Sequence, residues 1–124
     1  MKLVTNQIFA IHISAIAEAL TLGTKSGLDP EAMVDFLKAS VIPKILDYKA
    51  SPMIAKDYSP TFTVNLVLKE LRMIAAMAEE NKVPTPLCTM ARQIYMGAAA
   101  LGHGDLDQNA ILEYFETSSG MSEA

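Results

Sequence analysis

The first two turns of the chain carry two side chains with useful chemistry, Lys2 and Asn6. A lysine can exchange a proton, and an asparagine both donates and accepts hydrogen bonds. Residues four apart share one face of an α-helix, so both side chains can reach the same small molecule. Taken alone, Lys2 is most simply a solvated lysine at a chain start. A helix dipole disfavours a cation there by roughly 0.3–1 kcal/mol, which makes Lys2 a candidate for proton transfer as well.

Lys69 is the second cation that stands out from its surroundings. It falls on the same helical stripe as Phe62, Leu66 and Met73, where an apolar residue is expected. The simplest explanation is a lysine whose alkyl stem packs while its ammonium reaches water. The alternative is that Lys69 binds an anionic ligand.

The remaining candidates predict no further site. His12 and His103 have no partner at metal-ligand spacing, so we predict no metal. Cys88 lies in an apolar segment and is expected to be a small core residue. No glycine-rich phosphate loop is present in the sequence.

Helical periodicity supplies the elements that must position these residues. The first helix is predicted over residues 2 to about 26, with one face running from Lys2 and Asn6 into Ile13 and Leu20. Asp29 is the expected N-cap of a second helix that ends near residue 39. Further helices are predicted over 62–81, over 87–101, and from Asp107 to about residue 115.

Between residues 40 and 60, three prolines limit helix length, and we expect two short pieces at 44–49 and 53–56. No segment shows sustained strand alternation, so the fold class is all-α. The 124 residues, 51% hydrophobic and 19% charged, suit one globular domain.

Charge and composition exclude some classes of partner. The net charge is −4 and lysines and arginines are not clustered, so we expect no nucleic-acid partner. Polar residues interrupt the first helix, from which we predict neither a signal peptide nor a membrane partner. One cysteine excludes an internal disulfide. These observations predict a soluble, cytoplasmic protein.

Several short motifs resemble those of the β-hydroxyacid dehydrogenases, a family that includes 3-hydroxyisobutyrate dehydrogenase and tartronate semialdehyde reductase. Lys2-Leu3-Val4-Thr5-Asn6 resembles the Lys-x-x-x-Asn end of the family's catalytic signature. Phe62, Leu66 and Lys69-Glu70-Leu71 resemble its Phe-x-x-x-Leu-x-x-Lys-Asp-Leu stretch, with Glu70 in place of Asp. Gly27-Leu28-Asp29-Pro30 and Gly102-His103-Gly104-Asp105-Leu106-Asp107 match two of its turns.

The resemblance implies a C-terminal helical domain over residues 1–124, similar to that of 6-phosphogluconate dehydrogenase-like enzymes, with the N-terminal nucleotide-binding domain absent. It implies that Lys2 is the catalytic acid/base and that Asn6 binds the substrate. Lys69 and Phe62 would contact the cofactor, NAD or NADP, held mainly by the missing domain. The implied partners are a small 3-hydroxyacid, that domain and a second subunit.

Two alternatives to this interpretation stay open. One is a stand-alone helical dimerisation or binding module without catalytic activity. The other is a relative of the imine reductases, which the lysine at position 2 disfavours. By itself, the isolated chain is expected to have no dehydrogenase activity, because nothing in it cradles a pyrophosphate.

Overall fold

The computed structural model describes residues 1–41 and 43–121, and over these residues it is helical. Its α-helices are α1 (Lys2–Lys25), α2 (Pro30–Lys38), α3 (Pro43–Ile54), α4 (Val64–Asn81), α5 (Pro86–Ala98) and α6 (Ile111–Ser118). A 3₁₀ turn, η2 (Gln108–Ala110), precedes α6. Within the described ranges no β-strand forms, and Thr63 and Asp107 make a single isolated antiparallel bridge. The predicted all-α class is confirmed.

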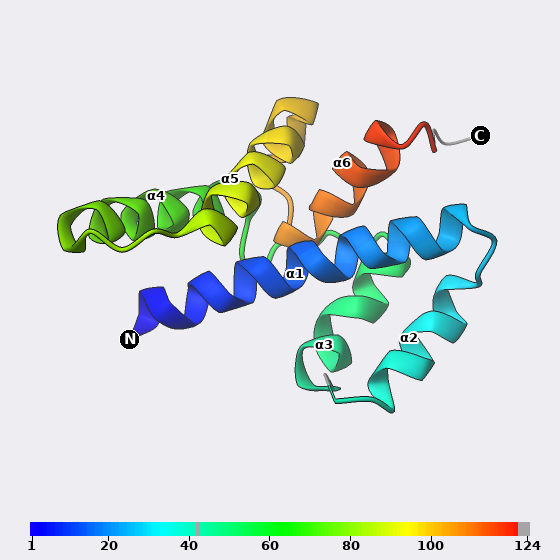
Figure 1. Cartoon of the computed structure of the whole chain (residues 1–124). Helices are drawn as coiled ribbons and strands as arrows, with labels where there is room; N and C mark the ends of the chain where they lie inside the picture. The colour runs from blue at the N-terminus through cyan, green and yellow to red at the C-terminus, as the bar shows by residue number, and fades with distance from the viewer. Residues whose placement is uncertain (42, 122–124) are drawn as a thin grey trace.

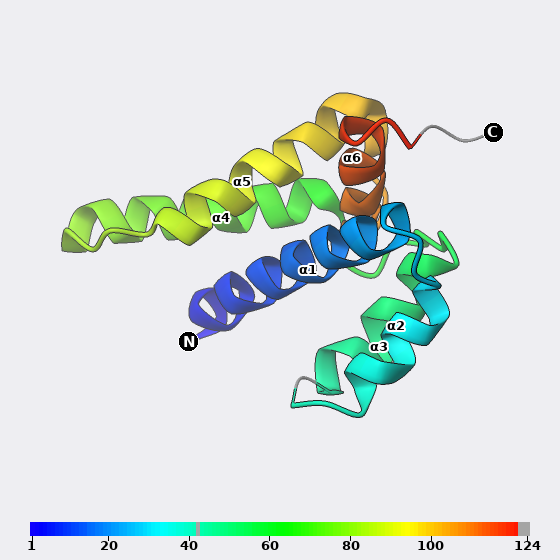
Figure 2. The same ribbon diagram turned by 45° about the vertical axis from the view of Figure 1, so that its right-hand side comes forward.

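The long helix α1 lies at the centre of the domain. In Figure 1 it runs between the α4–α5 pair on one side and the α2–α3 pair on the other, and α6 packs near its C-terminal half. Figure 2 shows α4 and α5 lying together along α1. Ile13, Ala17 and Leu20 are buried, as the predicted face requires. The opposite side of α1 is left open, with Ile8 and Leu22 among its exposed residues.

Local signals place the ends of the first helices. Gly27 adopts a left-handed φ of +96°, a conformation that favours glycine, and α1 ends just before it at Lys25. The Asp29 side chain then accepts a hydrogen bond from the backbone N–H of Ala32 at 2.9 Å, and Pro30 is the first residue of α2. The predicted cap and the predicted turn are both confirmed.

The segment around Pro52 differs from the prediction of two short pieces. One continuous helix, α3, covers it, and Pro52 lies inside its last turn. A proline inside a helix has no N–H to donate to the preceding turn, and the loss of this hydrogen bond destabilises the helix. Ala50 and Met53, three residues apart on one face, are both fully buried against the core. Burial of that face favours the continuous helix in spite of Pro52.

By length and composition alone, α1 meets the criterion for a helix that could cross a membrane. Its polar interruptions therefore do not exclude a span by themselves, contrary to the expectation from the sequence. The central helix of a soluble protein meets the same criterion, and α1 contacts each of the other five α-helices named above. The absence of a membrane partner stays a prediction.

Two loops that are distant in the sequence are joined beside α3. The backbone N–H of Asp107 donates to the carbonyl of Tyr58 at 3.0 Å, and that of Gln108 donates to the carbonyl of Phe62 at 2.9 Å. The N–H of Val64 donates to the carbonyl of Leu106 at 3.0 Å. These bonds fix the entry into α4 against the start of η2, and they carry Asp107 into the interior.

Candidate functional site

A pocket of about 560 Å³ opens where the N-terminal half of α1 meets α3, the start of α4 and η2. Apolar walls with a few polar groups are typical of ligand pockets, and this lining has that composition. The lining residues are Thr5, Asn6, Phe9, Tyr48, Lys49, Thr61, Phe62, Val67, Glu70, Leu71 and Gln108.

Two of the predicted site residues line this pocket. Asn6 reaches it from the second turn of α1, one turn before Phe9 on the same face. Phe62 reaches it from the loop just before α4, whose first turn is capped by the Thr63 side chain accepting from the N–H of Leu66 at 3.1 Å. Asn6 and Phe62, from two separate segments, therefore meet in one pocket, and their predicted roles toward substrate and cofactor stay predictions.

Lys2 lies at the edge of the pocket and reaches it through an acidic neighbour. Its Nζ is 3.7 Å from Oε1 of Glu70, which is one of the lining residues. The Lys2 side chain is 78% exposed and that of Glu70 only 12% exposed. An ion pair with one partner in water is weak and leaves the lysine free to change partners. Among the described residues, Glu70 thus links the exposed Lys2 side chain to the lining of the pocket.

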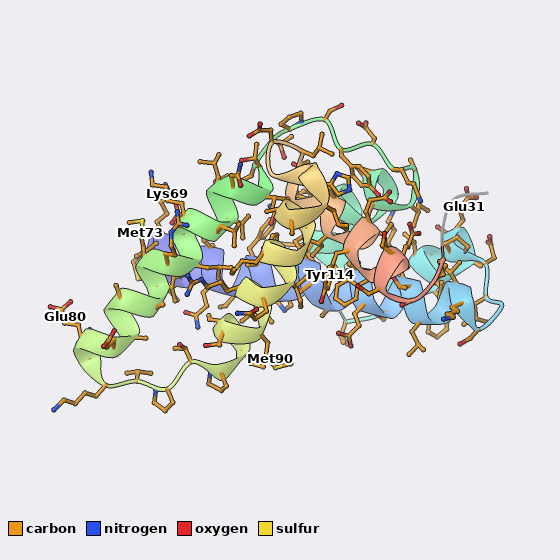
Figure 3. All side chains as sticks on the ribbon, turned by 90° about the horizontal axis from the view of Figure 1, so that it is seen from above. Glu31, Lys69, Met73, Glu80, Met90 and Tyr114 are labelled. Carbon is orange, nitrogen blue, oxygen red and sulfur yellow. The ribbon has the colours of Figure 1, made fainter. Side chains whose placement is uncertain are left out.

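Lys69 is not brought to the pocket by the described residues. It is exposed, and it forms no hydrogen bond or ion pair with any of them. Figure 3 shows Lys69 and Met73 on the side of α4 that faces away from α5. Leu66 and Met73, which share its stripe, are also 43% and 46% exposed. The role of Lys69 toward a cofactor stays a prediction.

The lysine that the structure does place in the pocket is Lys49, on α3. Its side chain is only 8% exposed. Its Nζ lies 3.4 Å from Oδ1 of Asp107 and 3.2 Å from Oγ1 of Thr61. The Phe9 ring centroid is 5.8 Å from the same nitrogen, at the outer range of a cation–π contact, and Phe9 stacks on Tyr48.

The Asp107 carboxylate is hydrogen-bonded to α3, to the loop before α4 and to η2, and so joins these three segments. Its Oδ2 accepts from the backbone N–H of Thr61 at 3.0 Å, from the Thr61 hydroxyl at 2.8 Å and from the N–H of Phe62 at 3.2 Å. Its Oδ1 accepts from the N–H of Asn109 at 3.1 Å. Burial alone would raise the pKa of Asp107, but the hydrogen bonds from Thr61, Asn109 and Phe62 outweigh it and hold that pKa below its ordinary value.

Gln108 completes the polar part of the pocket from η2. It is buried, and its Oε1 accepts a hydrogen bond from the hydroxyl of Tyr95 at 3.2 Å. Burial raises the pKa of Tyr95, so the phenol stays protonated and remains a donor. The side-chain amide of Gln108 is thereby oriented by a residue that lies outside the pocket.

The sequence did not single out Lys49, and it left the role of Glu70 undecided. Lys49 falls in the segment expected to be broken by prolines, so no helical face could be assigned to it. Asp107 was predicted as a cap, which is confirmed by its bond to Asn109, but its pairing with Lys49 spans 58 residues and has no local signal. Lys49 is next to Ala50 and four residues before Met53, and both of these apolar residues are buried. This proximity to apolar residues was the single feature of the sequence that could have indicated a buried lysine on α3.

Cys88 is the small core residue that was predicted. Cys88 is buried and free, and burial raises the pKa of its thiol. In the part of the chain that the structure describes, no group of three or more His, Cys, Asp or Glu side chains could hold a metal ion.

Comparison with known proteins gives a consistent picture. Residues 1–115 match the family model described as "NAD-binding of NADP-dependent 3-hydroxyisobutyrate dehydrogenase". The chain is 34% identical over 116 residues to L-threonate dehydrogenase of Cupriavidus necator, covering 93% of this chain and 39% of that protein. It is 33% identical over 124 residues to 2-(hydroxymethyl)glutarate dehydrogenase of Eubacterium barkeri, covering 98% and 41%.

A solved structure agrees with these relatives. The crystal structure of 3-hydroxyisobutyrate dehydrogenase from Salmonella typhimurium superposes with a TM-score of 0.86 at 25% identity, covering 92% of this chain and 40% of that one. The chain thus spans about two fifths of the length of the relatives that it matches.

Proposed function

This chain belongs to the family of the NAD-binding domain of NADP-dependent 3-hydroxyisobutyrate dehydrogenase, and from that premise we propose that it is the substrate-side domain of an NAD(P)-dependent 3-hydroxyacid dehydrogenase. The observation that carries the proposal is the single pocket shared by Asn6, Phe62 and Glu70, with Lys2 bound to Glu70 at its edge. These residues come from α1, from the loop before α4 and from α4 itself.

In this proposal Lys2 exchanges a proton with the hydroxyl oxygen of the substrate. A positioned proton-transfer group of this kind contributes about 10²–10⁴-fold to a rate. Glu70 acts as a positioning residue, since its Oε1 attracts the Lys2 ammonium from the solvent side toward the pocket. Asn6 binds the substrate through its side-chain amide and fixes the reacting carbon.

The residues present suit one end of a nicotinamide cofactor. Oε2 of Glu70 is buried and finds no hydrogen-bond partner in the described part of the chain, so an acceptor in the pocket awaits a donor such as a carboxamide N–H or a hydroxyl. Phe62 and Leu71 supply apolar walls against which a flat ring can lie. When bound, NAD or NADP supplies the acceptor or donor of the hydride. The phosphates would be held elsewhere, because the sequence has no loop for them.

We propose also that this domain forms a subunit interface. Val4 and Ile8 line an apolar groove between α1 and α3, Leu22 lines another between α1 and α2, and the three side chains are 45%, 52% and 69% exposed. Exposed apolar grooves of this kind commonly mark a protein–protein contact. Analytical ultracentrifugation at micromolar concentration should therefore show a dimer or larger species. A monomer under those conditions would contradict this part of the proposal.

The test of the catalytic role is steady-state kinetics with a nucleotide-binding domain of a family relative joined ahead of Met1. With 3-hydroxyisobutyrate as substrate, Lys2→Ala should lower kcat by about 10²–10⁴-fold and change KM much less, because proton transfer is lost mainly in the transition state. Lys2→Arg should not restore the rate, since a guanidinium does not release its proton near neutral pH.

Three comparisons make the result specific. Lys44→Ala removes an exposed lysine of α3 outside the pocket and should leave both constants unchanged. Lys69→Ala should act chiefly on KM, because its proposed role is attraction of an anionic ligand. The unfused chain should show no turnover. A Lys2→Arg variant near the wild-type rate would end the acid/base role, and a fused protein without turnover would favour a helical binding module.

A further inference from the structure

Gln108 is a polar side chain in the pocket wall that no part of the proposed proton or hydride transfer uses. It lines the pocket from η2, and it is only 1% exposed. A side-chain amide carries an acceptor oxygen at one end and a nitrogen with two N–H donors at the other. Buried polar groups of this kind are normally hydrogen-bonded, so each end of the amide requires a partner.

The oxygen end of Gln108 has its partner outside the pocket. The hydroxyl of Tyr95, on α5, donates to Oε1 of Gln108 at 3.2 Å. Tyr95 is fully buried and is not among the lining residues. Burial raises the pKa of its phenol, so Tyr95 keeps the proton that it donates. This hydrogen bond fixes the oxygen of the amide toward α5.

The nitrogen end of Gln108 is left for the pocket. Over residues 1–41 and 43–121, no group accepts a hydrogen bond from Nε2 of Gln108. An amide N–H that is withdrawn from water without an acceptor is costly. The bond to Tyr95 explains why the oxygen of Gln108 is tolerated in the interior, but it does not explain the nitrogen. A ligand with an acceptor atom at this point would satisfy it.

The requirement of Gln108 is the opposite of that of Glu70. Oε2 of Glu70 is a buried acceptor that finds no donor in the described part of the chain, and it belongs to α4. Nε2 of Gln108 is a donor, and it belongs to η2. The two groups therefore need different atoms of a ligand and do not compete for the same one.

We propose that the side-chain amide of Gln108 is a ligand-binding group of this pocket, which donates from Nε2 to a carbonyl-type oxygen of the ligand. Tyr95 is its positioning residue. The carboxylate of an acid substrate and the carboxamide of a nicotinamide cofactor both offer such an oxygen, and the inference rests on the proposed function for these two sources. The hydrogen bond itself requires no turnover, so it can be measured on the 124-residue chain as it stands.

The experiment follows the side-chain amide signals of the isotope-labelled chain by NMR during titration with three small probes. Isobutyrate offers a carboxylate, nicotinamide offers a carboxamide, and isobutylammonium offers N–H donors and no acceptor. Isobutyrate, nicotinamide or both should shift the Nε2–H signals of Gln108, and the one that does so identifies the source of the oxygen. Isobutylammonium should leave these signals in place. Gln93, an exposed glutamine of α5, is the internal control and should not respond to any probe.

Variants separate the donor of Gln108 from its packing. Gln108→Glu keeps an oxygen for Tyr95 and nearly the same shape, but it replaces the nitrogen on the pocket side by an oxygen. It should weaken binding of the effective probe by at least about 10-fold, because a donor is exchanged for an acceptor. Gln93→Glu makes the same change of charge on the surface and should leave the affinity unchanged.

Tyr95→Phe tests the positioning role, because it removes the hydroxyl and retains the ring. An amide that is free to turn presents its nitrogen to the pocket for only part of the time, so the affinity should fall by about 2-fold or more. In the Gln108→Glu background both ends of the side chain are oxygens, and Tyr95→Phe should cause no further loss. A purely structural role of Tyr95 would lower the affinity equally in both backgrounds.

Three results would overturn the proposal. They are Gln108 signals that respond to neither isobutyrate nor nicotinamide, signals that respond equally to isobutylammonium, and an unchanged affinity in Gln108→Glu. The Gln108 signals are measured on the wild-type chain, so the test does not depend on the folding of any variant. A fused enzyme without turnover, whose Gln108 signals still respond to a probe, would overturn the proposed function alone.

Discussion

Two ion pairs meet the same pocket in opposite environments. Lys2 and Glu70 approach to 3.7 Å at the edge, where the lysine is largely in water. Lys49 and Asp107 approach to 3.4 Å in the interior, where both side chains are more than nine-tenths buried. A similar separation therefore has different consequences, because water screens the first pair and not the second.

The two ion pairs also differ in the number of hydrogen bonds that hold their side chains in place. Asp107 is tied to three other residues by hydrogen bonds, and the carbonyl of Lys49 accepts from Nδ2 of Asn109 at 3.2 Å, so the buried pair is part of the framework between α3 and η2. Lys2 has Glu70 as its one described ion-pair partner. The described contacts therefore hold Lys49 at several points and Lys2 at one.

The largest expected change in stability comes from removing Asp107, the carboxylate of the buried ion pair. Asp107→Ala leaves the Lys49 charge buried and three backbone donors without an acceptor, and it should lower the free energy of unfolding by about 3–5 kcal/mol. Urea denaturation followed by circular dichroism measures this. Asp105→Ala is the matched control. Exposed Asp105 accepts a side-chain hydrogen bond from Asn65 and, within the described residues, from no other side chain, so its loss should cost less than about 1 kcal/mol. A loss below 1 kcal/mol for Asp107→Ala would contradict a structural role for the pair.

A smaller change in the free energy of unfolding is expected when the pH is lowered until Asp107 is protonated. The folded-state pKa of Asp107 lies below its reference value of 3.8, so its contribution to stability is complete above about pH 3.8 and is lost as the pH falls through the folded-state value. Asp107→Asn removes this titration. The difference in unfolding free energy between wild type and Asp107→Asn should therefore narrow in strongly acidic solution. A constant difference from neutral to acidic pH would show that the charge of Asp107 contributes nothing.

The smallest effect on stability is expected at the edge pair. Lys2→Ala should change the free energy of unfolding by no more than about 1 kcal/mol, because exposed ion pairs contribute little. The same substitution should have a large effect on kcat in the fused enzyme. A loss of stability as large as that of Asp107→Ala would remove the distinction between the two pairs and make Lys2 a structural residue.

The features that the sequence predicted well depend on neighbours along the chain. The cap at Asp29, the turn at Gly27 and the buried face of α1 through Ile13 and Leu20 follow from hydrogen bonds and periodicity within a few residues. Asn6 and Phe62 were predicted by resemblance, and both line the pocket. Their roles toward substrate and cofactor stay predictions.

The sequence by itself therefore determined the helical class, most helix ends and the apolar core of α1, because propensity, capping and periodicity act locally. Only the tertiary structure decided that α3 continues through Pro52, because burial of Ala50 and Met53 outweighs a lost backbone bond. It also decided that Lys49 meets Asp107 and that Glu70 meets Lys2, pairs separated by 58 and 68 residues. Such pairs depend on how α1, α3, α4 and η2 pack together, and no local pattern in any one of these segments encodes the identity of its distant partner.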